Sequence, residues 1–267
     1  MKVALTIAGS DSGGGAGLQA DLKTFAALGV YGTSVVSAVT AQNTRGVTRV
    51  EPMARELVRA QLDAVLSDFP VAAAKTGMLG TADVVEEVAA ALARVPGVLL
   101  VVDPVTRASS GAALLDDAGA SALVRLLLPR AEVVTPNLVE AEALSARAAR
   151  TPSEIRDAAR AIRDLGPEVV VVKGGHAEGA ESVDLVHDAD GFFEIRGPRL
   201  STRATHGTGC TLSAAITAGL ACGHSARDAA LRARRYLEGA MSSAGSLGAG
   251  AGPMHHLHPF YPWGELS

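Results

Sequence analysis

Residues 205–211 (THGTGCT) combine the residue types that bind and transfer a phosphoryl group. Gly207 and Gly209 flank one small residue, so the backbone can turn until successive N–H groups point the same way. The apolar run 212–220 predicts a helix whose positive end faces the same point. This pattern is typical of an anion site, and residues 207–209 are called the cradle below. A helix N-terminus should also lower the pKa of the adjacent Cys210 thiol below its free value of about 8.5.

A purely structural interpretation of this stretch is equally open. Glycine-rich loops before helices are common, so Gly207 and Gly209 could simply form a tight loop. Cys210 would then be a small buried apolar side chain. The polar residues at the other predicted strand ends are the evidence that distinguishes the two interpretations.

Acidic and amide groups follow two predicted strands. Residues 98–102 are a continuous β-branched and leucine run, as in a strand buried on both faces of a parallel sheet. Asp103 follows, and an acid in this position is a metal or water ligand about as often as a helix cap. Residues 133–135 lead to Asn137 and Glu140, which have the spacing of a helix cap and its N3 partner. For Glu140, a contact with magnesium-bound water is the alternative.

Lys173 follows the most strand-like segment of the chain, residues 169–172. Lysine occurs at only four positions, because this chain otherwise uses arginine as its cation. A compact ammonium before two glycines suggests a phosphate contact, although one lysine in four could fall there by chance.

The first 80 residues predict a second ligand-facing region. Residues 3–8 form a strand, residues 9–17 a glycine-rich loop and residues 18–28 a helix, but neither G-x-G-x-x-G nor G-x-x-x-x-G-K-[ST] is present. The loop is therefore either a steric turn or a close approach to a small ligand. Gln42 could recognise a heterocycle through its amide or be an ordinary loop residue. Met78 is either core filler or an apolar wall for a flat ring.

The order of elements predicts one α/β domain, residues 1–267, with a mostly parallel sheet between helix layers. An antiparallel hairpin, residues 182–187 and 192–195, is expected at the sheet edge. The polar strand ends and the cradle should then lie along one edge of the sheet. Further helices are expected around residues 57–69, 84–92, 155–165 and 226–244.

Composition excludes several partners. The chain has 267 residues, 48% of them hydrophobic, a net charge of -4 and a pI near 6.0, so neither nucleic acid nor a membrane surface is an expected partner. No signal peptide or membrane anchor is recognised, and a cytoplasmic protein is expected. Two cysteines without metal-ligand spacing do not favour a disulfide, and the tail histidines do not favour zinc.

The chain also resembles a known family, the bacterial hydroxymethylpyrimidine/phosphomethylpyrimidine kinases of thiamine synthesis, which are ribokinase-like. The resemblance runs nearly end to end, and its motifs are highly specific together. They are AGSD at 8–11, GGAGLQADLKTF at 14–25, AQNT at 41–44, GML at 77–79, TPNLVEA at 135–141, KGGH at 173–176 and HGTGCT at 206–211.

This resemblance implies two successive ATP-dependent phosphorylations, first of 4-amino-5-hydroxymethyl-2-methylpyrimidine and then of its monophosphate, with ATP and Mg²⁺ as cofactors. It implies that the cradle, Gly207 to Gly209, stabilises the transferred group. Cys210 stands where sugar kinases of the wider family carry an aspartate base, and it is the expected base; a homodimer is the expected assembly. The implied pyrimidine-binding residues are Gly9, Asp21, Thr40, Gln42 and Met78; the ATP-binding residues are Lys173, Asn137, Thr208 and Thr211; and the magnesium ligands are Asp103 and Glu140.

Two alternatives remain. A pyridoxal kinase of the same family is the nearer one, and Gln42 favours the aminopyrimidine because related pyridoxal-type members tend to carry methionine there. A non-catalytic pyrimidine sensor is the other, but such a protein would be expected to lack Lys173, Cys210 or the cradle, and all are present.

Overall fold

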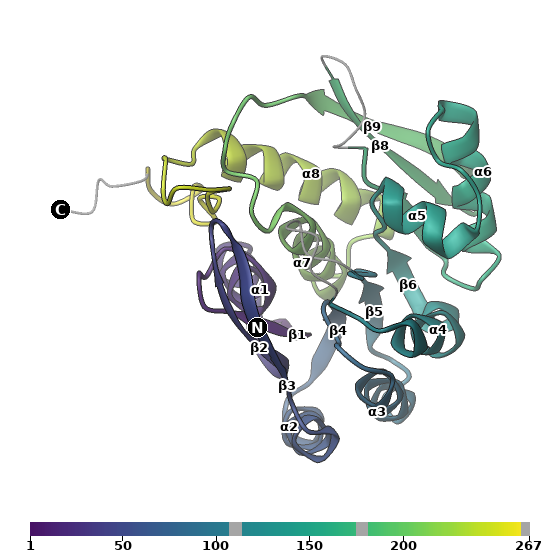
Figure 1. Cartoon of the computed structure of the whole chain (residues 1–267). Coiled ribbons are helices and arrows are strands. Elements are labelled where there is room, and N and C mark those ends of the chain that lie inside the picture. The colour runs from purple at the N-terminus through teal and green to yellow at the C-terminus, as the bar shows by residue number, and fades with distance from the viewer. Residues whose placement is uncertain (107–113, 175–180, 263–267) are drawn as a thin grey trace.

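The computed structural model describes residues 1–106, 114–174 and 181–262. Within these residues, the strands form one sheet of nine, in the order β3-β2-β1-β4-β5-β6-β7-β8-β9 (Figure 1). The neighbours from β2 to β7 are parallel, whereas β3, β8 and β9 run antiparallel at the two edges. The strands are β1 (Val3–Asp11), β2 (Tyr31–Asn43), β3 (Gly46–Pro52), β4 (Val71–Thr76), β5 (Leu99–Val102), β6 (Ala131–Val134), β7 (Val169–Val172), β8 (Glu181–Asp188) and β9 (Gly191–Pro198).

Helices cover both faces of the sheet, as the sequence predicts (Figure 1). Helices α1, α7 and α8 pack on one face and α2 to α6 on the other. The helices are α1 (Gly17–Ala27), α2 (Arg55–Asp68), α3 (Ala82–Ala93), α4 (Asp117–Leu126), α5 (Leu138–Ser145), α6 (Pro152–Arg163), α7 (Thr208–Ala221) and α8 (Ala226–Ser242), with a short 3-10 turn at Leu128–Arg130.

The apolar strands are buried on both faces because their side chains alternate between two cores. In β5, Leu100 and Val102 pack toward α2 to α6, and Val101 packs toward α1, α7 and α8. Burying one such side chain contributes about 1.5–3 kcal/mol. The prediction of a doubly buried strand before Asp103 is confirmed for Leu100 to Val102, whereas β5 begins at Leu99 and this side chain is exposed.

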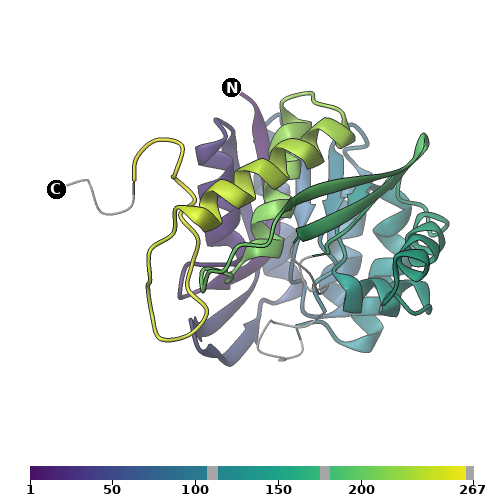
Figure 2. The same cartoon turned by 90° about the horizontal axis from the view of Figure 1, so that it is seen from above.

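The predicted antiparallel hairpin is confirmed as β8 and β9, which lie beside α8 (Figure 2). A buried ion pair of 2.8 Å between Arg234 of α8 and Asp184 of β8 joins them. A second antiparallel edge, β3 on β2, is not predicted from the sequence, because most β3 side chains are half-buried or exposed and lack an apolar alternation. No helix in the described part of the chain has the length and apolar character needed to cross a membrane.

Candidate phosphoryl-transfer site

The cradle lies at the start of α7. Gly207 precedes the helix with a φ of 84°, and a Cβ there would overlap the carbonyl oxygen of Gly15, so only glycine fits. The first N–H groups of a helix have no partner within the helix, and Gly207 has no side chain to bind them. Thr208, Gly209 and Cys210 therefore present backbone donors and the positive helix end to one point.

Lys173 faces this cradle. A Cβ placed on Gly209 would lie 3.2 Å from Lys173 Nζ and 3.8 Å from Asp103 Oδ2. Lys173 Nζ is 3.0 Å from Asp103 Oδ1 and 3.7 Å from Glu140 Oε2. Burial alone would lower the pKa of Lys173, but the two carboxylates raise it above its usual range. The ammonium is thus a permanent positive charge beside the cradle.

Both carboxylates next to Lys173 are held by well-defined partners. Asp103 accepts hydrogen bonds from Thr135 Oγ1 and Ser213 Oγ, each at 3.2 Å. Burial would raise the pKa of Asp103, but the ammonium of Lys173 lowers it below its ordinary value. Asp103 therefore remains a carboxylate.

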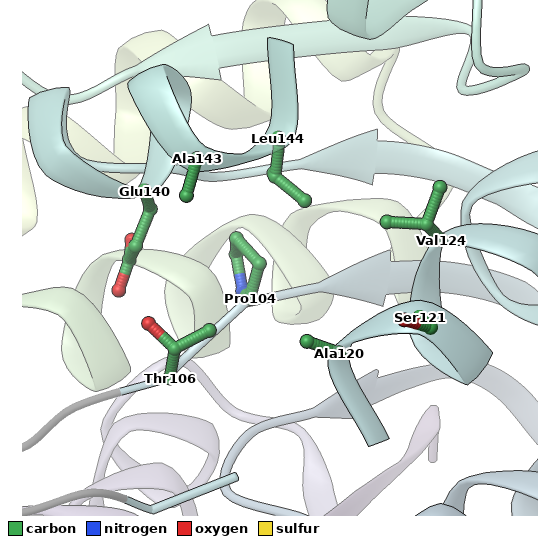
Figure 3. A pocket seen from close by; sticks show the side chains of 8 residues that line it. All are labelled: Pro104, Thr106, Ala120, Ser121, Val124, Glu140, Ala143 and Leu144. Carbon is green, nitrogen blue, oxygen red and sulfur yellow. The ribbon is translucent and has the colours of Figure 1, made fainter. Parts of the chain in front are cut away.

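Glu140 and Asn137 form the predicted capping box of α5. Asn137 Oδ1 accepts from the Glu140 N–H at 2.9 Å, and Glu140 Oε2 accepts from the Asn137 N–H at 2.8 Å. Among the described residues, the hydrogen bonds of the Glu140 carboxylate to the capping box use Oε2 and not Oε1. Glu140 lines one end of a mainly apolar cavity of about 390 Å³ between α4 and α5 (Figure 3). The capping interpretation is confirmed, and it leaves one carboxylate oxygen of Glu140 for a ligand.

Four of the five expected pyrimidine-binding residues cluster around the ends of β1, β2 and β4. A Cβ on Gly9 would lie 3.0 Å from the Met78 sulfur, so this methionine covers the end of β1. Thr40 Oγ1 donates a hydrogen bond of 3.0 Å to Gln42 Oε1. These residues offer an apolar wall beside one polar amide.

Asp21, the fifth, faces the interior. Its carboxylate is fully buried, bonded to Lys75 Nζ at 2.9 and 3.0 Å and to Thr6 Oγ1 at 2.6 Å. Burial alone would lower the pKa of Lys75, but Asp21 raises it, so the pair is ionic. Asp21 therefore holds the Lys75 ammonium in place in the interior.

The expectation of a lowered pKa for Cys210 is wrong. Burial raises the pKa of this thiol to about 11, and the nearby Lys75 ammonium and the Gly17 N–H only partly oppose that effect. The sequence shows a helix start but not how deeply the sulfur is enclosed, and desolvation outweighs the helix end. Cys210 is therefore a thiol at neutral pH.

Two more expected ATP contacts differ in their surroundings. Thr208 begins α7 and is half-buried at the cradle. Thr211 is fully buried, and its hydroxyl lies 3.0 Å from His256 Nε2 in the segment after α8. The Thr211 side chain thus joins α7 to the tail. Gly175 and His176 of the KGGH motif lie outside the described residues.

Sequence reasoning missed a link between the N-terminal loop and the cradle. Asp11 accepts from the N–H groups of Gly13, Gly15 and Ala16 at 2.8 to 3.0 Å and from His206 Nε2 at 2.8 Å. Both residues belong to recognised motifs, but nothing in the sequence pairs positions so far apart. The pair holds the glycine-rich loop against the cradle.

A family model described as phosphomethylpyrimidine kinase matches residues 11–255. The chain belongs to the phosphomethylpyrimidine kinase family. A Rhizobium meliloti relative named hydroxymethylpyrimidine/phosphomethylpyrimidine kinase is 52% identical over 262 residues, covering 97% of this chain and 98% of the relative. The solved phosphomethylpyrimidine kinase of Clostridium difficile has a TM-score of 0.79 and 39% identity, covering 89% of this chain and 98% of the other.

A second solved relative is a pyridoxal kinase. The pyridoxal kinase of Staphylococcus aureus, in complex with AMP-PCP and pyridoxal, has a TM-score of 0.89 and 34% identity, covering 97% of this chain and 94% of the other. The expected ribokinase-like α/β fold is confirmed by this likeness. That relative binds an ATP analogue together with pyridoxal.

Proposed function

We propose that this protein uses ATP to phosphorylate the hydroxymethyl group of 4-amino-5-hydroxymethyl-2-methylpyrimidine and then phosphorylates the resulting monophosphate. One observation carries the proposal: the free N–H groups of the cradle, the Lys173 ammonium and Cys210 meet at the start of α7, with Lys173 Nζ 3.2 Å from a Cβ position on Gly209. Anion donors, a fixed cation and a proton acceptor are the parts that phosphoryl transfer requires.

The cradle and Lys173 act by position and charge. Negative charge spreads over the oxygens of the migrating phosphoryl group, and preorganised donors stabilise it without further rearrangement. Lys173 is fixed by Asp103 and Glu140, so its charge is in place before the nucleotide arrives. The Thr208 N–H would be a further donor to the phosphoryl oxygens. The backbone of Asn137 lies next to that of Lys173, because the two residues form an isolated β-bridge.

Asp103 and Glu140 fit a magnesium ion held jointly with the nucleotide. The described residues contain no group of three or more His, Cys, Asp or Glu side chains arranged to hold a metal. Mg²⁺, however, is usually bound by one or two carboxylates together with phosphate oxygens and water. When bound there, it would neutralise charge on the phosphates.

Cys210 is the proposed acceptor of the alcohol proton. In the transfer, the substrate O–H bond breaks and its proton passes to the Cys210 sulfur, the oxygen bonds to the γ-phosphorus, and the bond from phosphorus to the β-phosphate oxygen breaks to release ADP. A thiol with a pKa of about 11 must first lose its own proton, so this base acts through a minor thiolate fraction.

Pyridoxal is the second candidate substrate, favoured by the likeness to the Staphylococcus aureus enzyme. Both substrates are flat rings bearing a hydroxymethyl group, which Gly9 and Met78 could accommodate alike. Gln42 favours the pyrimidine over pyridoxal, because its amide can pair with a ring nitrogen and an adjacent amine.

The test is ATP turnover by the purified protein with each alcohol, with products followed by phosphorus NMR. We expect a monophosphate and then a diphosphate from the pyrimidine, with a higher kcat/KM than for pyridoxal. If neither alcohol causes ADP release, the kinase proposal is rejected and a sensor is favoured.

We also infer a cytoplasmic homodimer. Light scattering would check the dimer, and cell fractionation would check the location.

A further inference from the structure

The chain that leaves β7 is fastened to the edge hairpin by a side chain. The backbone pairing of β7 with β8 ends at Val172 and Leu185. Two residues further on, the Gly174 N–H donates a hydrogen bond of 2.9 Å to Asp184 Oδ1 of β8. A Cβ on Gly174 would overlap the carbonyl oxygen of Val183, so only glycine allows this close approach. The Asp184 side chain thus joins the two strands beyond the point where their backbone ladder stops.

Asp184 is a buried carboxylate with partners in two directions. It is 4% exposed, and its second oxygen, Oδ2, accepts from Arg234 Nη1 at 2.8 Å. Arg234 belongs to α8, the helix beside the hairpin (Figure 2), and its Nε donates to Glu238 Oε1 at 2.7 Å. A carboxylate has acceptor oxygens only, so it can satisfy the Arg234 guanidinium on one side and the Gly174 N–H on the other.

The Gly174 N–H belongs to the peptide group directly after Lys173. On the other side of this lysine, the Lys173 N–H donates to the Pro136 carbonyl at 2.8 Å. The backbone of Lys173 is therefore held at both ends, by the loop before α5 and by β8. Its side chain is held by Asp103 and Glu140, which are also the proposed magnesium ligands. Those carboxylates would share their charge with a metal ion, whereas the two backbone contacts would stay as they are.

We propose that Asp184, held by Arg234, is a positioning residue that keeps the Lys173 ammonium directed at the nucleotide phosphates by fixing the peptide group after it. The inference rests on the proposed function for the role of Lys173. Without the bond to Asp184, the end of β7 is held on one side only, and the Cα of Lys173 can shift. A misplacement of about 1 Å can cost about 10²-fold in rate. The edge hairpin and α8 thereby support the phosphoryl-transfer site, although both lie outside the cradle.

Asp184→Asn is the most specific test, because it keeps the shape of the side chain but leaves one acceptor oxygen. The charged Arg234 guanidinium is the stronger donor and takes that oxygen, so the NH₂ group faces the Gly174 N–H and their bond is lost. We expect kcat to fall about 10- to 100-fold and KM for ATP to rise about tenfold. KM for the pyrimidine should stay within about twofold of wild type, because the pyrimidine-binding residues lie on other strands.

Two control variants separate positioning from stability. Glu238→Gln changes the same ion-pair network but leaves the Asp184 contact with Gly174 in place, so both KM values should stay as in the wild type. Ile195→Val loosens the packing of β9 opposite Asp184 without removing either hydrogen bond. It should lower Tm in calorimetry and leave both KM values unchanged. A merely structural role of Asp184 would make Asp184→Asn behave like Ile195→Val, which would overturn the inference.

A second set of measurements does not depend on turnover. Hydrogen exchange of the Gly174 amide, followed by NMR of the nitrogen-15-labelled protein, should be slow in the wild type and about tenfold faster in Asp184→Asn. Exchange in the wild type at the rate of a free amide would overturn the inference. ATP affinity, measured by calorimetry with Mg²⁺ present, should be about tenfold weaker in Asp184→Asn than in the wild type.

The affinity measurement also distinguishes the two proposals. If the wild type binds ATP but phosphorylates neither alcohol, the kinase proposal fails. The ratio of the two ATP dissociation constants then decides alone whether Asp184 positions Lys173, and a ratio within about twofold of one would refute that role. A wild type that binds no ATP would overturn both proposals.

Discussion

Replacing Cys210 with alanine isolates the proton-removal step. With a thiol pKa of about 11, the thiolate fraction at pH 7 is about 10⁻⁴. If that thiolate is the base, wild-type kcat/KM should rise about tenfold per pH unit between pH 7 and pH 9. Cys210→Ala should lose about 10²–10⁴-fold in kcat, the usual contribution of a general base, and this rise should disappear.

Initial rates of ADP release over that pH range, at several pyrimidine concentrations, separate kcat from KM. Cys222→Ala is the matched control, since Cys222 is exposed at the far end of α7 and should behave as wild type. The reasoning is refuted if Cys210→Ala keeps near-normal kcat and KM and the same pH dependence. The cradle and Lys173 would then carry the step without a protein base.

Three further variants test buried polar side chains and their partners. Lys75→Met should lower the free energy of unfolding by about 3–5 kcal/mol, because it leaves the buried Asp21 carboxylate without its cation; adding Asp21→Leu should restore much of the loss in urea titrations. Thr76→Val should keep or raise Tm by calorimetry, because Thr76 Oγ1 is the one buried side-chain oxygen or nitrogen without a hydrogen-bond partner in the described residues; a clear fall would mean that the hydroxyl is bonded. Glu87→Gln should cost about 1–2 kcal/mol at pH 7, since Arg59, itself half-exposed, lowers the pKa of Glu87 to about 2. A lowered carboxyl pKa adds stability above pH 4.5 that is lost as the pH falls toward 2, so the difference between wild type and variant should shrink over that range.

The central strands could be predicted because burial on both faces requires continuous β-branched and leucine runs, such as residues 169–172. The capping box at Asn137 could be predicted because it is local in sequence. Strand β3 could not, because it is held by pairing with β2 rather than by an apolar pattern. Helix α4 was missed, although Asp116 caps it by accepting from the Gly119 N–H, a local signal of the same kind as Asn137.

Within the site, the parallel-sheet rule correctly brings Asp103, Lys173 and the cradle to one edge. It cannot pair Asp11 with His206, because that contact depends on how a glycine loop folds over α7. The same limit explains the wrong direction for Cys210. A helix start is visible in the sequence, but the desolvation that outweighs it arises from the packing of α1, α7 and β4.

Lys75 and Lys173 show why residue type and topological position alone do not determine a role. Each lies at the carboxyl end of a parallel strand and contacts an aspartate, at 2.9 and 3.0 Å. The Lys75 side chain is 0% exposed, enclosed with Asp21 beneath α1, so no incoming phosphate can reach its ammonium. The Lys173 side chain is 14% exposed and faces Gly209, so it can share its charge with a new anion while keeping Asp103. Exposure, set by helix packing, makes the first lysine a structural support and leaves the second accessible to an anion, as its proposed role requires.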